Sequence, residues 1–545
     1  MVAHAALDPI GATADGIEEP GVAAAMTDYS PDGFAARTEL LRTTLTELAA
    51  TTPVDERERV AAEAMAERLG LELEMLEAGI PQSQLSVIDS PLHSTREVFD
   101  LAEADTEQAW ADVATRLAAV PSTVRGYVDT LREQAAQGRV TSARQVTAVV
   151  GQLAGWTRTG SAVFPALVRD AAVGSGLRSD LDRAAAGATA ALGDVGTFLT
   201  DDLGPQAREV DAVGREHYAL CSRYFLGAVV DLDETYHWAF DELDRIETQM
   251  RGIARTLTGS NDVGAAAQAL DDDPERVIHG AEAFRDWMQE RSDLAVAELG
   301  ATHFDIPEPI RRLDCRIAPT RDGGIYYTGP SEDFRRPGSM WWSVPEGVDT
   351  FSTWHELTTV HHEGVPGHHL QVAQTIYRRE LLNRWQRFSS WVSGHGEGWA
   401  LYAEQLMAEL GYLDEPGVRF GMYDSQAFRA TRVIIDIGMH LQLEIPRDNP
   451  FGFHPGQRWT PELGWEFLTT HVRMDEALLR FELDRYLGWP GQAPSYKVGQ
   501  RIWLEARADA KARRAADFDL REFHRQALDL GSLGLDPFRA ALARL

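Results

Sequence analysis

Residues 361–370 read His-His-Glu-Gly-Val-Pro-Gly-His-His-Leu. The fold around this stretch must place its histidines where they can bind a metal. Four of the chain's 16 histidines fall within it. Neutral imidazole is the side chain best suited to zinc, and a carboxylate beside such ligands can act as a general base on water. A His-Glu pair followed one helical turn later by another histidine is typical of zinc metallopeptidases. The stretch therefore predicts a metal site with Glu363 as its general base.

The spacing within this stretch differs from the usual pattern, in which two ligating histidines stand four positions apart on one helix face. Four positions after His362 comes Pro366, which has no side-chain donor and kinks a helix. On a straight helix, His368 would lie about 120° around the axis from His362, and His369 about 10 Å along it. Because proline breaks the hydrogen-bond ladder and glycine tolerates unusual backbone angles, the Pro366-Gly367 pair can carry His368 back beside His362. The sequence leaves the choice between His368 and His369 as second ligand open.

A zinc peptidase needs a third protein ligand, which is commonly a carboxylate from another helix. The best candidate is Glu397, in the run SGHGEGWALYAE at 393–404. Glu404 shares its helix face and could act as a partner behind the ligands. A solvated acidic helix is the simpler interpretation, but Trp399 and its apolar neighbours favour a buried helix, where an unpaired carboxylate is costly. His395 is the alternative third ligand.

Two further histidines near the motif are expected to be structural. The pair His355-Glu356 imitates the start of the motif but has no histidine four positions later. His361 is adjacent to His362 and so points about 100° away from it on a helix. We expect neither His355 nor His361 to bind the metal.

Peptide hydrolysis also needs a donor aimed at the developing oxyanion, and a tyrosine or an arginine can fill that role. A turn-rich segment near the end of the chain offers Arg485, Tyr486 and Tyr496. Ordinary packing is the alternative interpretation for both tyrosines. The sequence therefore predicts these three residues as catalytic candidates.

A second polar group follows the motif on an apolar stretch of helical pattern. Asp436 and His440 come shortly after Arg429 and Arg432. Buried acidic, basic and imidazole groups on such a helix usually form a paired network that supports the core. We expect that structural role here.

The composition excludes several classes of function. With 84 acidic and 52 basic residues the formal net charge is -32, so the chain repels phosphate backbones and anionic membranes, and nucleic acid is not an expected partner. The two cysteines, Cys221 and Cys315, exclude a disulfide framework and are expected to be buried and structural. No apolar stretch reaches the roughly 18 residues needed to cross a membrane. Residues 1–30 lack the features of a signal peptide, and we expect a cytoplasmic protein with a disordered leader there.

Helical patterns dominate the chain from Phe34 onward. Apolar residues recur at helical spacing throughout an expected N-terminal helical region at 31–305. Within it, start signals predict separate helices over 106–117 and 122–136. The amphipathic spacing indicates a protein that is mainly α.

The sequence pattern changes at 306–350, where prolines and glycines separate short β-like runs at 324–327 and 340–343. Helical pattern then resumes, and we expect 351–545 to form a catalytic helical region that is integrated with the first one. The prediction is a large helical fold with a small β insertion just before the site. An edge strand there could pair with a peptide ligand through its backbone.

The motif and its companions resemble the large bacterial family catalogued as domain of unknown function 885, which is grouped with zinc metallopeptidases of the gluzincin type. The stretches that carry the resemblance are 362–371, 397–404, 436–440, 485–496 and 523–533. The resemblance implies a mainly helical, gluzincin-like fold with an active-site groove and one zinc ion per chain. It also implies Glu363 as general base, with His362, one histidine of the pair His368 and His369, and Glu397 as ligands.

One hypothesis and two alternatives follow. The hypothesis is a zinc-dependent hydrolase, a metallopeptidase, that cleaves peptide bonds of small peptides; the peptide is then its partner, and homodimer formation is left open. A metal-dependent amidase of a non-peptide metabolite would carry the same motif. So would a catalytically silent binding scaffold. The motif does not exclude another divalent metal.

Overall fold

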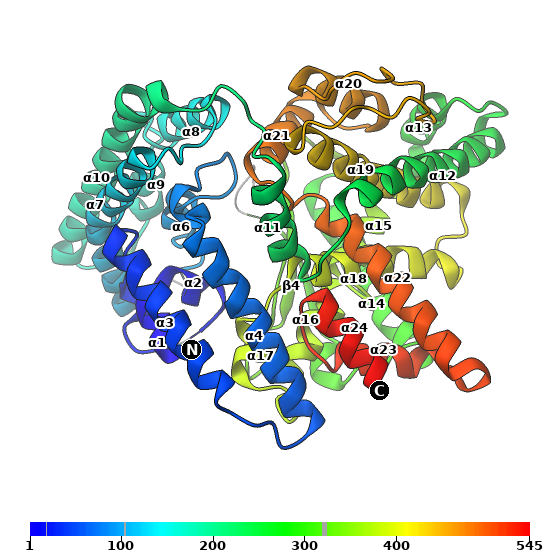
Figure 1. Ribbon diagram of the computed structural model, residues 1–545, viewed down its shortest axis with the longest axis horizontal. Helices are drawn as coiled ribbons and strands as arrows, with labels where there is room; N and C mark the ends of the chain where they lie inside the picture. The colour runs from blue at the N-terminus through cyan, green and yellow to red at the C-terminus, as the bar shows by residue number, and fades with distance from the viewer. Residues whose placement is uncertain (18, 103–104, 319–323) are drawn as a thin grey trace. The chain divides into compact units, whose positions relative to one another are not determined.

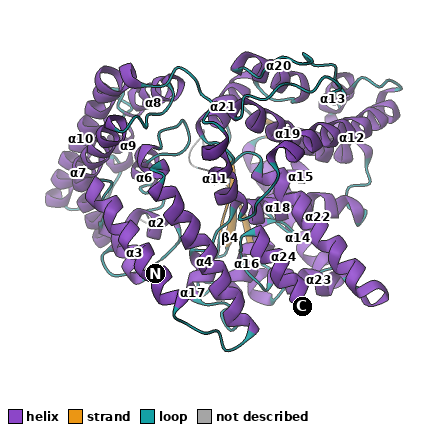
Figure 2. Ribbon diagram, in the orientation of Figure 1, coloured by secondary structure: helices purple, strands orange, loops and turns teal. Residues whose placement is uncertain are grey.

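The structure, a computed structural model, describes residues 1–17, 19–102, 105–318 and 324–545. Helix accounts for 67% and strand for 4%, which confirms the predicted mainly α fold (Figure 2). The chain divides into two compact units. The first unit comprises Met1–Thr52, Leu69–Gly214 and Arg480–Pro490, and the second comprises Pro53–Arg68, Arg215–Leu479 and Gly491–Leu545.

These boundaries differ from the expected regions at 31–305, 306–350 and 351–545. Two helices, α4 (Glu56–Glu77) and α21 (Glu476–Gly488), each run from the second unit into the first. A boundary inside a continuous helix leaves no change of periodicity or composition, so the sequence pattern could not reveal it.

The first unit contains α4 and α21 in part, together with nine further α-helices among its described residues. They are α1 (Val2–Leu7), α2 (Pro9–Ala14), α3 (Pro31–Ala49), α5 (Ile80–Ser83), α6 (Pro91–Glu97), α7 (Glu107–Ala136), α8 (Ala143–Trp156), α9 (Val163–Val168) and α10 (Ser175–Phe198). Short turns of 3-10 or π-helix lie at Val22–Ala24, Leu199–Leu203 and Gly204–Gln206.

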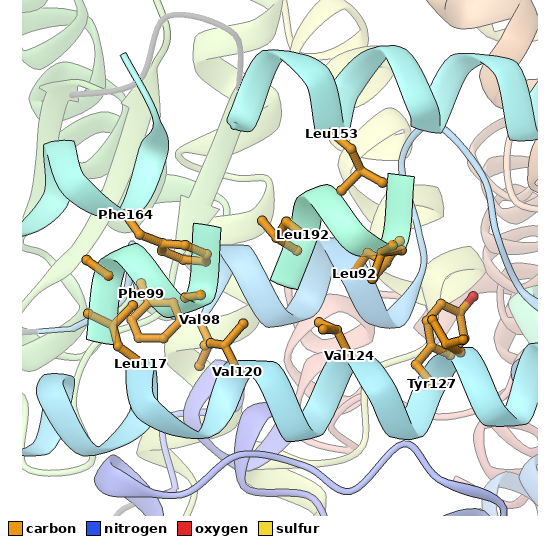
Figure 3. Close-up of a cluster of buried hydrophobic side chains, with 14 of the residues drawn as sticks. Leu92, Val98, Phe99, Leu117, Val120, Val124, Tyr127, Leu153, Phe164 and Leu192 are labelled. Atoms are coloured by element: carbon orange, nitrogen blue, oxygen red, sulfur yellow. The ribbon is translucent and has the colours of Figure 1, made fainter. Parts of the chain in front are cut away.

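A continuous apolar core fills this unit, and α7 supplies much of it. Figure 3 shows Val120 and Val124 of α7 among the buried side chains of this cluster. The two predicted helices over 106–117 and 122–136 are one helix, with Pro121 inside it. Its apolar stripe runs on past the proline, and burial of that stripe outweighs the backbone hydrogen bond that proline removes.

The first residues are helical where a disordered leader was expected over 1–30. Asp8 begins α2 by accepting a hydrogen bond from the backbone N–H of Gly11 at 3.1 Å. Ile10 is 4% exposed and belongs to the core of the first unit. Buried apolar surface of this kind offsets the entropy of ordering, which a composition rich in alanine, glycine and aspartate does not reveal.

The second unit holds the remaining helices and all the strands that the described residues form (Figure 1). Its helices are α11 (Arg215–Leu226), α12 (Leu232–Thr258), α13 (Val263–Asp271), α14 (Ala281–Thr302), α15 (Thr353–Glu363), α16 (His368–Tyr377), α17 (Arg384–Phe388), α18 (Ser393–Glu409), α19 (Pro416–His440), α20 (Pro461–His471), α22 (Ser495–Arg514), α23 (Leu520–Leu528) and α24 (Leu535–Arg544), with 3-10 turns at Pro274–Arg276, Glu308–Ile310 and Ala515–Asp517.

The strands form two small sheets. They are β1 (Val277–His279), β2 (Leu313–Ile317), β3 (Ile325–Thr328), β4 (Gly338–Trp342) and β5 (Thr350–Ser352). In the larger sheet β4 is central, parallel to β2 and antiparallel to β3; β1 and β5 pair antiparallel. Strands β3 and β4 confirm the two predicted β runs, while residues 319–323 of that segment lie outside the described residues.

The sheet supports the helix that carries the histidine motif. Met340 of β4 and Val360 of α15 share one apolar cluster with Phe284 of α14. On its other sides α15 packs against α18 and α19. Within the part of the chain that the structure describes, no helix combines the length and the apolarity that a membrane span requires.

Candidate metal centre

The motif lies at a break between two helices. Helix α15 ends at Glu363, a turn follows over 364–367, and α16 begins at His368. Gly367 makes that turn passable, because a β-carbon there would collide with the backbone carbonyls of His361 and His362. The break is held from α18, where the indole N–H of Trp399 donates to the carbonyl oxygens of Pro366 at 2.9 Å and Gly367 at 3.2 Å.

This break brings His368 beside His362, as the Pro366-Gly367 pair predicted. Their rings are nearly perpendicular, at 89°, with centroids 4.8 Å apart. Glu397, near the start of α18, faces both: its Oε2 lies 3.3 Å from His362 Nε2 and 3.4 Å from His368 Nε2. We call these three side chains the triad.

The spacing within the triad suits a shared cation. Zinc held tetrahedrally at 2.0–2.1 Å separates neighbouring ligand atoms by about 3.3 Å, which matches both distances to Glu397. Although Glu397 is 16% exposed, its Oε2 is buried and accepts no hydrogen bond from the residues that the structure describes. A buried carboxylate oxygen that lies between two imidazole nitrogens has the surroundings of a metal ligand.

Glu363 lies against the triad. One oxygen of Glu363 and one nitrogen each of His362 and His368 fall within 4.8 Å of one another. Both carboxylates are thus within reach of a cation, but Glu397 makes the closer approach to both imidazoles. Burial raises the pKa of Glu363 above its ordinary value, although the neighbouring histidines oppose the shift. Its Oε2 is buried and has no hydrogen-bond partner in the described part of the chain.

Glu404 lies behind His362 and is fully buried. Its Oε1 is 2.8 Å from His362 Nδ1. Burial alone would lower the pKa of His362, but its contacts with Glu397 and Glu404 raise that pKa to about 10. The carboxylate of Glu404 therefore orients the imidazole and leaves Nε2 directed at Glu397.

His369 is directed elsewhere. Its Nε2 lies 2.7 Å from the carbonyl oxygen of Ile310, and its Nδ1 lies 2.9 Å from the hydroxyl of Tyr327. Burial lowers its pKa to about 4, so the ring is neutral at physiological pH. Both ring nitrogens are thus engaged outside the triad, and of the two candidates only His368 stands beside His362.

The other histidines near the motif have partners of their own. His395 is 1% exposed, packs edge-on to Trp503, and accepts from the backbone N–H of Leu533 at 3.4 Å. His361 places its Nδ1 3.2 Å from the carbonyl oxygen of Val365. His355 faces the carboxylates of Glu356 and Asp424, at 3.7 Å and 3.9 Å.

The predicted oxyanion donors have contacts of a different kind. The hydroxyl of Tyr486 donates to Glu482 at 2.6 Å, and Arg485 donates to the same carboxylate at 2.9 Å. Both residues belong to the first unit, whereas the triad belongs to the second. Tyr496, in the second unit, has the guanidinium of Arg432 4.9 Å from its ring centroid. The oxyanion role of these residues stays a prediction.

Asp436 makes the contacts of a buried structural network. It accepts from the hydroxyl of Tyr218 at 2.6 Å and from the backbone N–H of Gly491 at 2.9 Å. The ring of His440 lies 3.9 Å away on the same helix. These contacts join α11 and α19 to the turn that precedes α22, as expected for a group that supports the core.

Sequence reasoning missed two residues that complete the surroundings of the triad. Trp391, although 50% exposed, sets its ring 6.0 Å from that of His368. Gln426 of α19 donates to Glu404 at 3.0 Å. A tryptophan just before a glycine-rich helix start was a usable signal for Trp391. No local pattern in the sequence identifies Gln426.

Comparisons with known proteins agree on the fold. The family described as "Bacterial protein of unknown function (DUF885)" matches residues 9–542. A crystal structure of a candidate lipoprotein from Colwellia psychrerythraea is similar with a TM-score of 0.85 and 23% identity, covering 99% of this chain and 96% of that one. A candidate lipoprotein of unknown function from Shewanella oneidensis follows with a TM-score of 0.74 and 16% identity, covering 99% and 97%. No curated protein matches.

Proposed function

This chain belongs to the DUF885 family, and we propose that it is a zinc-dependent hydrolase that cleaves peptide bonds in small peptides. The observation that carries the proposal is the triad. His362, His368 and Glu397 converge from three helices with the spacing of ligands around one tetrahedral cation.

The donor set fits zinc. Two imidazoles and one carboxylate are the protein ligands of a common class of catalytic zinc site, which keeps one position open for water or substrate. A zinc ion held there would polarise the scissile carbonyl and make a water molecule more acidic.

Glu363 has the position and the environment of a general base. Among the described residues its Oε2 has no hydrogen-bond partner, so it can accept a proton from water and pass that proton to the leaving amine. Burial raises the pKa of this carboxyl, which makes its ionised form a stronger base. Glu404 accepts from His362 Nδ1 and fixes the ligand's orientation.

A matched pair of substitutions tests the proposal. Glu363→Gln and Glu397→Gln make the same chemical change on two carboxylates of one cluster. We expect about one zinc per chain in the wild type by elemental analysis, retention in Glu363→Gln, and loss in Glu397→Gln and His362→Ala. Hydrolysis of a mixed peptide library should disappear in all three variants.

The same measurements can defeat the proposal. Wild-type protein that takes up no added zinc would contradict it outright. Zinc uptake with hydrolysis of small non-peptide amides but of no peptide would replace the substrate class. Unchanged hydrolysis in Glu363→Gln would remove Glu363 from the role of base.

A further inference from the structure

A buried lysine lies in the core of the second unit, two hydrogen-bonded residues behind the triad. Lys497 is 2% exposed, and the chain contains one other lysine, Lys511. Its ammonium donates to Glu242 at 2.9 Å, Gln426 at 2.7 Å and Gln500 at 2.7 Å. All three N–H donors of the ammonium therefore have an acceptor.

The ammonium decides how Gln426 is oriented. An ammonium can only donate, so the atom of Gln426 that faces it must be the carbonyl oxygen Oε1. The amide nitrogen Nε2 then points the other way, and it lies 3.0 Å from Glu404 Oε2. Without a donor on its far side, the amide could turn over and present an oxygen to that carboxylate.

Glu404 in turn fixes which ring nitrogen of His362 carries the hydrogen. An ionised carboxylate can only accept, so His362 Nδ1, 2.8 Å from Glu404 Oε1, must carry the hydrogen. When the ring gives up its other proton to bind a cation, its lone pair is then on Nε2, the atom that faces Glu397. The chain Lys497–Gln426–Glu404–His362 is unbroken, and each member is at most 4% exposed.

We propose that Lys497 is a positioning residue for the metal site: through Gln426 and Glu404 it fixes the tautomer and the orientation of His362. Packing alone does not call for a lysine, because a methionine of similar length would fill the space without the cost of burying an ammonium. Glu242 does not depend on it either, since Arg245 pairs with the same carboxylate at 2.7 Å. What the ammonium adds is a fixed direction for the amides that it faces, and of these the Gln426 amide leads to the metal site. The proposal rests on the metal binding of the proposed function.

Zinc affinity, measured by competition with a chromophoric chelator, tests this chain of contacts. We expect Lys497→Met and Gln426→Leu each to weaken zinc binding by about 10- to 100-fold, the usual effect of losing a partner behind a metal ligand. Lys511→Met is the matched control, since it makes the same change at an exposed position of the same helix α22. Its affinity should equal that of the wild type.

The double variant distinguishes an effect of Lys497 that acts through Gln426 from an independent structural effect. If Lys497 acts through Gln426, Lys497→Met should cost nothing further once Gln426→Leu is present, whereas independent structural effects would add. Additive losses, or a folded Lys497→Met with wild-type affinity, would overturn the proposal. If Lys497→Met does not fold, Gln426→Leu takes its place: a folded Gln426→Leu variant with wild-type zinc affinity would also overturn the proposal. Wild-type protein without zinc affinity would overturn the proposed function as well, whereas unchanged variants overturn only the role of Lys497.

Discussion

Two carboxylates in one buried cluster have pKa values that shift in opposite directions. Burial raises the pKa of Glu363, with the histidines unable to reverse the shift. Burial also acts to raise the pKa of Glu397, but its contacts with His368 and His362 prevail, and the value falls well below the ordinary range. A carboxyl group with a raised pKa is suited to proton transfer, whereas one with a lowered pKa stays ionised. They support Glu363 as base and Glu397 as ligand.

Adjacent histidines should respond differently to the same substitution. His368→Gln should abolish zinc binding, because it removes an imidazole from the triad. His369→Gln should leave the zinc content unchanged and lower the free energy of unfolding by about 1–3 kcal/mol, the cost of buried partners left unsatisfied at Ile310 and Tyr327. Elemental analysis and denaturant unfolding of both variants check this. Zinc loss in His369→Gln with retention in His368→Gln would reverse the assignment.

Asp89, in the first unit, gives a prediction on pH. Burial raises the pKa of its carboxyl to about 6, although a hydrogen bond from Trp489 opposes the shift. Because the folded value exceeds the ordinary value near 4, this group stabilises the fold most below pH 4, and that contribution is lost as the pH rises through 6. Asp89→Asn should therefore stabilise the protein at pH 7.5 by roughly 1–3 kcal/mol, with little effect near pH 4. Equal stabilisation at both pH values, from thermal unfolding, would show that charge is not the cause.

At the scale of elements, the site depends on how α15 stops and α16 starts. The indole of Trp399 supplies the hydrogen bonds that hold the turn, and a second fully buried tryptophan, Trp503, donates in the same way to the carbonyl oxygen of His395 at 3.0 Å. The two bonds from Trp399 support the break that places His368, whereas the bond from Trp503 supports the first turn of α18. The two rings lie 4.9 Å apart, so they make a closely matched pair.

Replacing each tryptophan by phenylalanine separates local support from general stability. Trp399→Phe and Trp503→Phe should each lower the free energy of unfolding by about 1–3 kcal/mol, because each leaves a buried carbonyl without its donor. Only Trp399→Phe should weaken zinc binding, since of the two tryptophans only Trp399 donates to the turn before His368. Unfolding in denaturant and chelator competition give the two readouts. Equal zinc affinity in both variants would show that the turn holds its shape unaided.

The sequence predicted the elements near the motif, because proline and glycine mark where they begin and end. The Pro366-Gly367 pair indicated a break that returns His368 to His362, and punctuation by proline and glycine predicted strands β3 and β4. Pro121 misled, since a strong apolar stripe keeps α7 continuous across it. The contacts of Glu404 with Gln426 and of Gln426 with Lys497 could not be foreseen, because 22 and 71 residues separate the partners and no periodicity relates them.

At the scale of the whole molecule, sequence order and spatial grouping differ. The first unit gathers three stretches, the last of which, Arg480–Pro490, comes from near the end of the chain. The triad, Glu363, Glu404 and Lys497 all come from the second unit. Ligand binding stabilises the cooperative region that must be folded for the site to exist, so a metal should act most strongly on that unit.

Hydrogen exchange read out by mass spectrometry can follow this effect along the chain. At zinc concentrations about a thousandfold above Kd, linkage contributes about 4 kcal/mol to whatever must unfold to release the ion. Exchange in α15, α16 and α18 should therefore slow on addition of zinc, while α7 and α10 should change little. His362→Ala should show no slowing anywhere, which excludes nonspecific binding by the acidic surface. Equal slowing in α7 and α10 would mean that the two units unfold as one, and the metal would then stabilise the entire chain.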